Sequence, residues 1–238
     1  MLVNADFDRP ALVTPDDHRW TPSPQRGVSR VMLDRVGAEQ ARATSLVRYD
    51  RASDFPSHAH PGGEEILVLE GTFSDETGDY PAGCYLRNPP GSAHRPRSAE
   101  GALILVKLRQ MAPDDATIVR VNTQDPANWT QGDGRSVCAL HRHGDETVDL
   151  IEITAGAALL PRHVDGAEIF VLRGGLRWGD RTLPPQSWLR LPGGEYADLR
   201  AGDEGLVAYL KTGVIAPIVS TAGERGVPAS PADKEYPT

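Results

Sequence analysis

Three histidines and one glutamate form the pattern in this chain that is best suited to chemistry. His58 and His60 stand two positions apart, Glu64 follows a Pro-Gly-Gly turn, and His94 follows a later Pro-Gly turn. Because residues i and i+2 of a β-strand point to the same face, the first two imidazoles can reach one point. Three imidazoles and a carboxylate suit a divalent cation such as zinc, iron, manganese or nickel. The spacing therefore predicts one metal ion held by His58, His60, Glu64 and His94.

The stretch that carries these residues occurs twice. Residues 60–71 align with residues 163–174 at an offset of 103, and the same offset continues without a gap to residues 89–91 and 192–194. Chance similarity would not keep register over such a length, so the repeat predicts two homologous units. We expect an N-terminal half at 1–112, a C-terminal half at 113–212, and a tail at 213–238 that is rich in Gly, Pro, Ala and Ser.

The repeat also distinguishes the expected metal ligands from neighbouring residues that have a structural role. At the same offset the four ligand positions hold Pro161, His163, Ala167 and Ala197, or Tyr196 if the register slips by one. A lone imidazole does not hold a metal tightly, so the C-terminal half is expected to carry none. Glu65 is the alternative carboxylate, but the metal-free half keeps it as Glu168. A residue kept where the ligands are lost favours a structural role, and Glu64 is therefore the preferred ligand.

A second His-x-His pair, His141 and His143, lies upstream of the strands that would match the first cluster. We interpret this pair as part of a solvated turn. Tyr49 and Tyr85 fall on expected strands, where they could line a cavity or pack the barrel. Arg87 has a counterpart, Arg190, in the metal-free half, which favours a structural role for it.

The secondary structure expected around these residues is almost entirely β. Short apolar runs, such as residues 43–49, 65–70, 84–87 and 103–108, alternate with Gly- and Pro-containing turns. The chain has 24 Gly and 20 Pro in 238 residues, which favours many short strands over long helices. Strands at this spacing are typical of a sandwich or small barrel.

Charge and cysteine content exclude several classes of function. The net charge is −8 and no basic run is present, so nucleic acid is not an expected partner. Two cysteines, Cys84 and Cys138, exclude a disulfide framework and a four-cysteine zinc site, and free buried thiols are expected. No apolar run is long enough to span a bilayer, and the N-terminus lacks the pattern of a signal peptide. These features predict a cytoplasmic protein without membrane contact.

The run His-x-His-x3-Glu-x6-Gly, at residues 58–71, and the run Gly-x5-Pro-x-Gly-x2-His, at residues 83–94, resemble the two signature motifs of the cupin superfamily. More narrowly, they resemble the cupin domain of ChrR-type anti-sigma factors. The resemblance covers residues 43–108 closely and 146–211 more weakly. It implies two tandem jelly-roll β-barrels, a bicupin, with the metal ligands His58, His60, Glu64 and His94.

Two activities follow from this resemblance. Acetylacetone-cleaving dioxygenases look similar over the same barrel and use iron(II), which implies a small-molecule metalloenzyme of dioxygenase or oxidoreductase type. In such an enzyme Glu64 would be a fourth ligand or a proton shuttle. ChrR itself implies a metal-dependent sensor or regulatory module. However, ChrR-type proteins bind a sigma factor through a separate zinc domain with a His-x3-Cys-x2-Cys motif. The chain has no Cys before Cys84, so a sigma factor is not an expected partner.

A third reading is a binding bicupin without turnover. In all three readings the partner is a small-molecule ligand or substrate, and the chain is a monomer or a homodimer.

Overall fold

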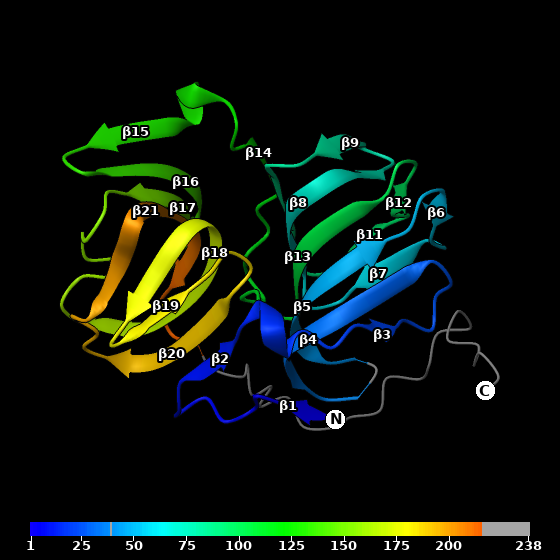
Figure 1. The fold of residues 1–238 in the computed structure, drawn as a ribbon. Helices are drawn as coiled ribbons and strands as arrows, with labels where there is room; N and C mark the ends of the chain where they lie inside the picture. Colours follow the sequence, from blue (N-terminus) through cyan, green and yellow to red (C-terminus); the bar gives the residue numbers. More distant parts are fainter. Residues whose placement is uncertain (39, 216–238) are drawn as a thin grey trace.

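The computed structural model describes residues 1–38 and 40–215. Nearly all regular structure in this part is strand; the two short helical turns are η1 (Pro15–Asp17) and η2 (Pro126–Asn128). Figure 1 shows two β-lobes side by side. The predicted all-β fold class is confirmed, and the arrangement agrees with the jelly-roll cupin. The expected tail lies, from residue 216 onwards, outside the described residues. The described chain contains no helix of the length and apolarity needed to cross a membrane.

The N-terminal lobe is built on an 11-stranded antiparallel sheet. Its main path runs through β1 (Leu2–Val3), β4 (Val28–Val36), β5 (Arg42–Tyr49), β13 (Ala102–Leu108), β8 (Glu64–Asp75), β10 (Cys84–Asn88) and β14 (Val119–Asn122). Branches add β3 (Thr21–Pro22), β6 (Ser53–Asp54), β9 (Gly78–Pro81) and β12 (Arg97–Ser98). A separate ribbon pairs β7 (His58–His60) with β11 (Ser92–His94).

The C-terminal lobe is built on an 8-stranded sheet. Its main path runs through β15 (Trp129–Gly132), β16 (Arg135–His143), β17 (Glu146–Ile153), β21 (Leu199–Thr212), β18 (Val164–Trp178), β20 (Trp188–Gly194) and β2 (Ala11–Val13), with β19 (Arg181–Leu183) beside β18. The strand register repeats that of the first lobe. Glu64 lies opposite Asn88, and 103 positions later Ala167 lies opposite Leu191.

Two strands cross between the lobes. β2 comes from the start of the chain but pairs with β20 of the C-terminal sheet, as Figure 1 shows in blue beside yellow-orange. Conversely, β14 follows residue 112 but pairs with β10 of the N-terminal sheet. The expected boundary between residues 112 and 113 therefore does not separate the two sheets completely. The N-terminal half contributes β2 to the C-terminal sheet, and the C-terminal half contributes β14 to the N-terminal sheet.

Central strands such as β10 and β13 are buried on both faces, because the sheet covers its own interior and also packs against the other lobe. In β8, Ile66 and Val68 point into the N-terminal lobe. Leu67 points into the junction, which is the buried interface between the two lobes. The junction core also contains Tyr85, Phe170, Trp188 and Tyr209. Burying such side chains stabilises each by about 1.5–3 kcal/mol. Tyr85 therefore packs the junction rather than a ligand cavity. Cys84 and Cys138 are free and buried, as predicted.

Candidate metal centre

The ribbon of β7 and β11 brings the three predicted histidines onto one face. His58 lies directly opposite His94, and His60 lies opposite Ser92. Residues opposite each other in an antiparallel pair project to the same face, and so do residues two apart in one strand. All three imidazoles therefore point to one side of the ribbon, while Ala59 and Ala93 point to the other.

A tight turn brings Glu64 back to these imidazoles. The amide of Gly63 donates to the His60 carbonyl over 3.0 Å. Gly63 has a φ of +75°, and a Cβ at this position would lie 2.4 Å from the sulfur of Met111. Only glycine fits both conditions. The turn places Glu64 at the first position of β8, where its side chain faces the ribbon.

The four predicted ligands converge. His60 Nε2 lies 3.0 Å from His94 Nε2. Glu64 Oε2 lies 3.5 Å from His60 Nε2 and 3.3 Å from His94 Nε2. The ligand atoms of the three histidines all lie within 4.8 Å of one another. Donor atoms held about 2.1 Å from one metal ion lie about 3.0–3.4 Å apart, so the spacings among His60, His94 and Glu64 suit a shared divalent cation, and His58 lies beside these three.

Outer hydrogen bonds orient two of the rings. His58 Nδ1 lies 3.0 Å from the Pro56 carbonyl, and His94 Nδ1 lies 3.3 Å from Asp75 Oδ2. Both partners accept a proton from Nδ1, which leaves Nε2 unprotonated and free to bind a metal. The sequence offered no spacing signal for Asp75.

Burial controls the protonation of the donor set. Burial, reinforced by His58 and His94, lowers the pKa of His60 to about 3. Burial also lowers the pKa of His94, although Asp75 opposes the shift. Burial raises the pKa of Glu64 to about 8, against the hydrogen bond from Asn88. Neutral imidazoles are the form that binds metals, and a divalent cation at this point would stabilise the Glu64 carboxylate.

An aromatic wall stands beside the centre. The Phe55 ring lies 6.1 Å from that of His58, and the Phe73 ring lies 5.9 Å from that of His94. Tyr49 packs between the two phenylalanines, at 5.4 and 5.8 Å. Burial, with the nearby Glu64 carboxylate, raises the pKa of Tyr49. Tyr49 therefore belongs to the surroundings of the centre, and its hydroxyl stays protonated.

Glu65, the alternative carboxylate, points away from the histidines. It is buried in the junction, where it accepts hydrogen bonds from Arg87 at 3.2 Å and from Tyr209, and pairs with Lys211 at 3.4 Å. Arg87 also binds Asp115 at 2.7 Å. Both residues thus have the structural position expected from their counterparts, Glu168 and Arg190.

The second His-x-His pair differs from the expectation of a solvated turn. His141 is buried and its Nε2 lies 2.9 Å from Asp115 Oδ2, whereas His143 is part-exposed beside Asp114 at 3.2 Å. The expectation is wrong for His141, because the linker that carries Asp115 covers it. Within residues 1–38 and 40–215, the one group of three or more His, Cys, Asp or Glu that could hold a metal ion is His58, His60 and His94.

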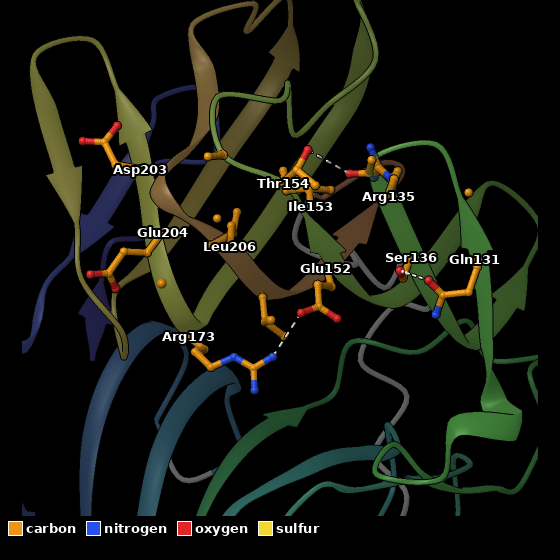
Figure 2. A pocket seen from close by; sticks show the side chains of 16 residues that line it. Gln131, Arg135, Ser136, Glu152, Ile153, Thr154, Arg173, Asp203, Glu204 and Leu206 are labelled. Carbon is orange, nitrogen blue, oxygen red and sulfur yellow. Dashed lines mark hydrogen bonds and ion pairs between the residues drawn. The ribbon is translucent and has the colours of Figure 1, made fainter.

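Among the described residues of the C-terminal lobe, the positions that match the four ligands keep one histidine, and apolar side chains fill the interior. His163 is exposed, and Ala167 is buried among apolar side chains. Leu159, Leu160 and Leu191 fill this lobe's interior. A separate pocket of about 590 Å³ opens on this lobe (Figure 2). Its lining includes Arg135, Glu152 and Arg173 but no histidine or cysteine.

Comparisons with known proteins agree with this geometry. The model of the ChrR cupin-like domain family matches residues 8–112. None of the curated proteins compared with the chain matches it.

Three solved structures share the fold. A candidate dioxygenase from Nostoc punctiforme is 16% identical, with a TM-score of 0.66 over 93% of this chain and 84% of its own. A bacterial pirin from Escherichia coli, in complex with nickel(II), is 14% identical, with a TM-score of 0.63 over 88% and 99%. A cupin 2 conserved barrel domain protein from Leptotrichia buccalis is 12% identical, with a TM-score of 0.59 over 89% and 99%. Residues 8–112 thus match the ChrR cupin-like domain family, and the described chain shares the fold of these three solved structures.

Proposed function

We propose that the chain is a bicupin that binds one divalent metal ion through His58, His60, Glu64 and His94 and uses it as a small-molecule metalloenzyme of dioxygenase or oxidoreductase type. The convergence of Glu64 Oε2 with the imidazole nitrogens of His60 and His94, at 3.3–3.5 Å, carries this proposal. Similar folds are described with metals: the pirin with nickel(II), and an oxalate decarboxylase from Bacillus subtilis with Mn(II) centres. Zinc, iron, manganese and nickel all suit this donor set.

The chain's own residues would prepare the centre for a chelating substrate. A divalent ion held by these four residues would supply Lewis-acid chemistry that polarises a chelating oxygen group of a substrate. Phe55, Phe73 and Tyr49 form an apolar wall that would exclude water and favour an organic substrate. Glu64 would either stay a ligand or, as a carboxylate, accept a proton from the substrate.

The test is oxygen consumption by the metal-loaded protein. Protein loaded separately with Fe²⁺, Mn²⁺, Ni²⁺ or Zn²⁺ is mixed with a simple β-diketone, and O₂ uptake is recorded. We expect uptake with a redox-active metal, matched one to one by diketone loss, and formation of a carboxylic acid and a 1,2-dicarbonyl product. His94→Ala should abolish the reaction, whereas His163→Ala, which changes an exposed histidine of the other lobe, should retain it. Absence of turnover with every metal would contradict the enzymatic proposal.

The match of residues 8–112 to a ChrR cupin-like domain favours a second candidate, a metal-dependent sensor or regulatory module. A sensor would bind metal without consuming substrate and would change its conformation with occupancy. Amide hydrogen exchange with and without Zn²⁺ separates the two candidates. Altered protection beyond the metal centre, in protein without turnover, would favour the sensor.

Partner and location belong to the same proposal. We propose a small-molecule ligand, no nucleic acid, no membrane contact, a cytoplasmic location, and a monomer or homodimer. Sedimentation of the purified protein with and without DNA tests the assembly state and the absence of nucleic-acid binding.

A further inference from the structure

Two of the expected ligands, Glu64 and His94, are connected to Arg120 through chains of hydrogen bonds. On the Glu64 side, Asn88 Nδ2 donates to Glu64 Oε2 over 3.2 Å, and Arg120 Nη2 donates to Asn88 Oδ1 over 2.7 Å. The arginine thus reaches one ligand through a single amide.

The His94 side returns to Arg120 through three side chains. His94 Nδ1 lies 3.3 Å from Asp75 Oδ2, and Thr77 Oγ1 donates to Asp75 Oδ1 over 2.6 Å. Because that bond uses the only hydroxyl proton of Thr77, the Tyr80 hydroxyl, at 2.6 Å, must donate to Thr77 Oγ1. Arg120 Nε in turn donates to the Tyr80 oxygen over 3.2 Å.

Both branches therefore run in one donor direction, from the guanidinium to a carboxylate. A chain of hydrogen bonds with one direction polarises each member and stiffens the set. The remaining Arg120 nitrogen, Nη1, donates to the Arg87 and Val119 carbonyls, at 3.1 and 2.7 Å. Four acceptors fix the planar group, which also lies over the Tyr80 ring at 5.5 Å. Arg120 is thus held in place although it lies near the surface.

The internal repeat allows the residues of the two branches to be compared with their counterparts in the C-terminal lobe. Matched strand registers pair five residues of the two branches with positions in the C-terminal lobe. The positions of Glu64, Asp75, Tyr80, Asn88 and Arg120 are occupied there by Ala167, Trp178, Leu183, Leu191 and Leu12.

The junction residues behave differently. Glu65, Arg87 and Lys107 keep their chemistry as Glu168, Arg190 and Lys211. The C-terminal lobe thus has the same fold without the two hydrogen-bonded branches. It also lacks three of the four expected metal ligands. The branches are therefore a property of the metal centre rather than of the fold.

We propose that Arg120 is a positioning residue that orients Glu64 and His94 for the metal ion, through Asn88 on one side and through Tyr80, Thr77 and Asp75 on the other. This inference rests on the proposed metal centre.

Cobalt(II) is the probe for this role, because its visible absorption reports the number and geometry of its ligands. Its dissociation constant, measured by competition with a chelator, and its spectrum are compared for wild type, Arg120→Ala, Arg120→Lys, Tyr80→Phe and Arg200→Ala. Arg200 is the matched control, since it is an exposed arginine that donates to a backbone carbonyl, that of Gly156, in the metal-free lobe. Unfolding midpoints of the metal-free proteins show whether each variant keeps its fold.

We expect Arg120→Ala to weaken cobalt binding by about 10- to 100-fold and to change the spectrum. Arg120→Lys should stay weakened, because one ammonium cannot bridge Asn88 and Tyr80. Tyr80→Phe, which keeps the ring and removes one hydroxyl, should weaken binding by about two- to tenfold. Arg200→Ala should match wild type.

Four results would overturn the proposal. Unchanged cobalt affinity and spectrum in Arg120→Ala would show that Arg120 does not position the ligands, while leaving the proposed metal centre intact. Full cobalt affinity in Arg120→Lys would show that only the positive charge of Arg120 matters, not its hydrogen bonds. Unchanged binding in Tyr80→Phe would overturn the link to His94. A wild type that binds no cobalt would overturn the metal centre itself, and the role of Arg120 with it.

Discussion

Lys107 of the N-terminal half contacts the carboxylate of Glu168 in the C-terminal half, and Lys211 contacts Glu65 in the reverse direction at 3.4 Å. Each lysine lies opposite the glutamate of its own sheet, Lys107 opposite Glu65 and Lys211 opposite Glu168, yet pairs ionically across the junction. All four side chains are buried. The duplicated halves are therefore joined by one charge pair used twice.

Lys107→Met should destabilise the protein by about 3–5 kcal/mol, because it leaves the buried Glu168 carboxylate without its cation. The double variant Lys107→Met/Glu168→Gln should recover a large part of this loss. Urea denaturation measures both. Arg173→Ala, which breaks an exposed pair with Glu152, is the control and should cost less than about 1 kcal/mol. Strictly additive losses in the double variant would contradict a coupled pair.

Adjacent glutamates should respond in opposite ways to the same change. Glu64→Gln should weaken metal binding with a small effect on the unfolding midpoint, since its carboxylate faces the histidines. Glu65→Gln should retain the metal and lower the unfolding midpoint, since its carboxylate faces Arg87 and Lys211. Elemental analysis and thermal denaturation of both variants check this assignment. Metal loss in Glu65→Gln alone would reverse it.

Metal content should be one equivalent per chain. His60→Ala should remove most of the metal, because tight binding needs the full donor set. His163→Ala is the matched control, since it changes the equivalent residue in the C-terminal lobe, which we expect to bind no metal. Two equivalents in wild type, or full occupancy in His60→Ala, would place the metal elsewhere.

Acid should weaken the junction through Asp115. Burial alone would raise the pKa of Asp115, but hydrogen bonds from Arg87 and the Thr117 amide outweigh it and lower the pKa to about 2. The folded pKa lies below the unfolded value of about 3.9, so this group contributes on the order of 2–3 kcal/mol above pH 4. That contribution is lost as the pH falls from 4 towards 2. Urea denaturation at pH 6 and pH 3 measures it, and Asp115→Asn should show a smaller difference between the two.

The sequence predicted the ligand face because it depends on local rules. A His-x-His pair on a strand, a glycine turn and a repeat at constant offset placed three imidazoles and Glu64 together. The choice of Glu64 over Glu65 also followed from the repeat, and the structure places Glu65 in the junction.

The outer parts of the centre could not be predicted in this way. Asp75, Asn88 and Arg120 lie on three separate strands, and their meeting depends on long-range pairing. β14 carries Arg120 back to the N-terminal sheet after the chain has left it, which no local periodicity indicates. His141 was misjudged for the same reason, because its cover comes from a linker far away in sequence.

Because β2 and β14 each pair with the sheet of the opposite lobe, each lobe depends on a strand from the other half of the chain. A protein truncated after residue 112 would lack β14 and with it Arg120. The remaining C-terminal fragment would lack its edge strand β2. Both lobes are therefore expected to unfold in a single transition.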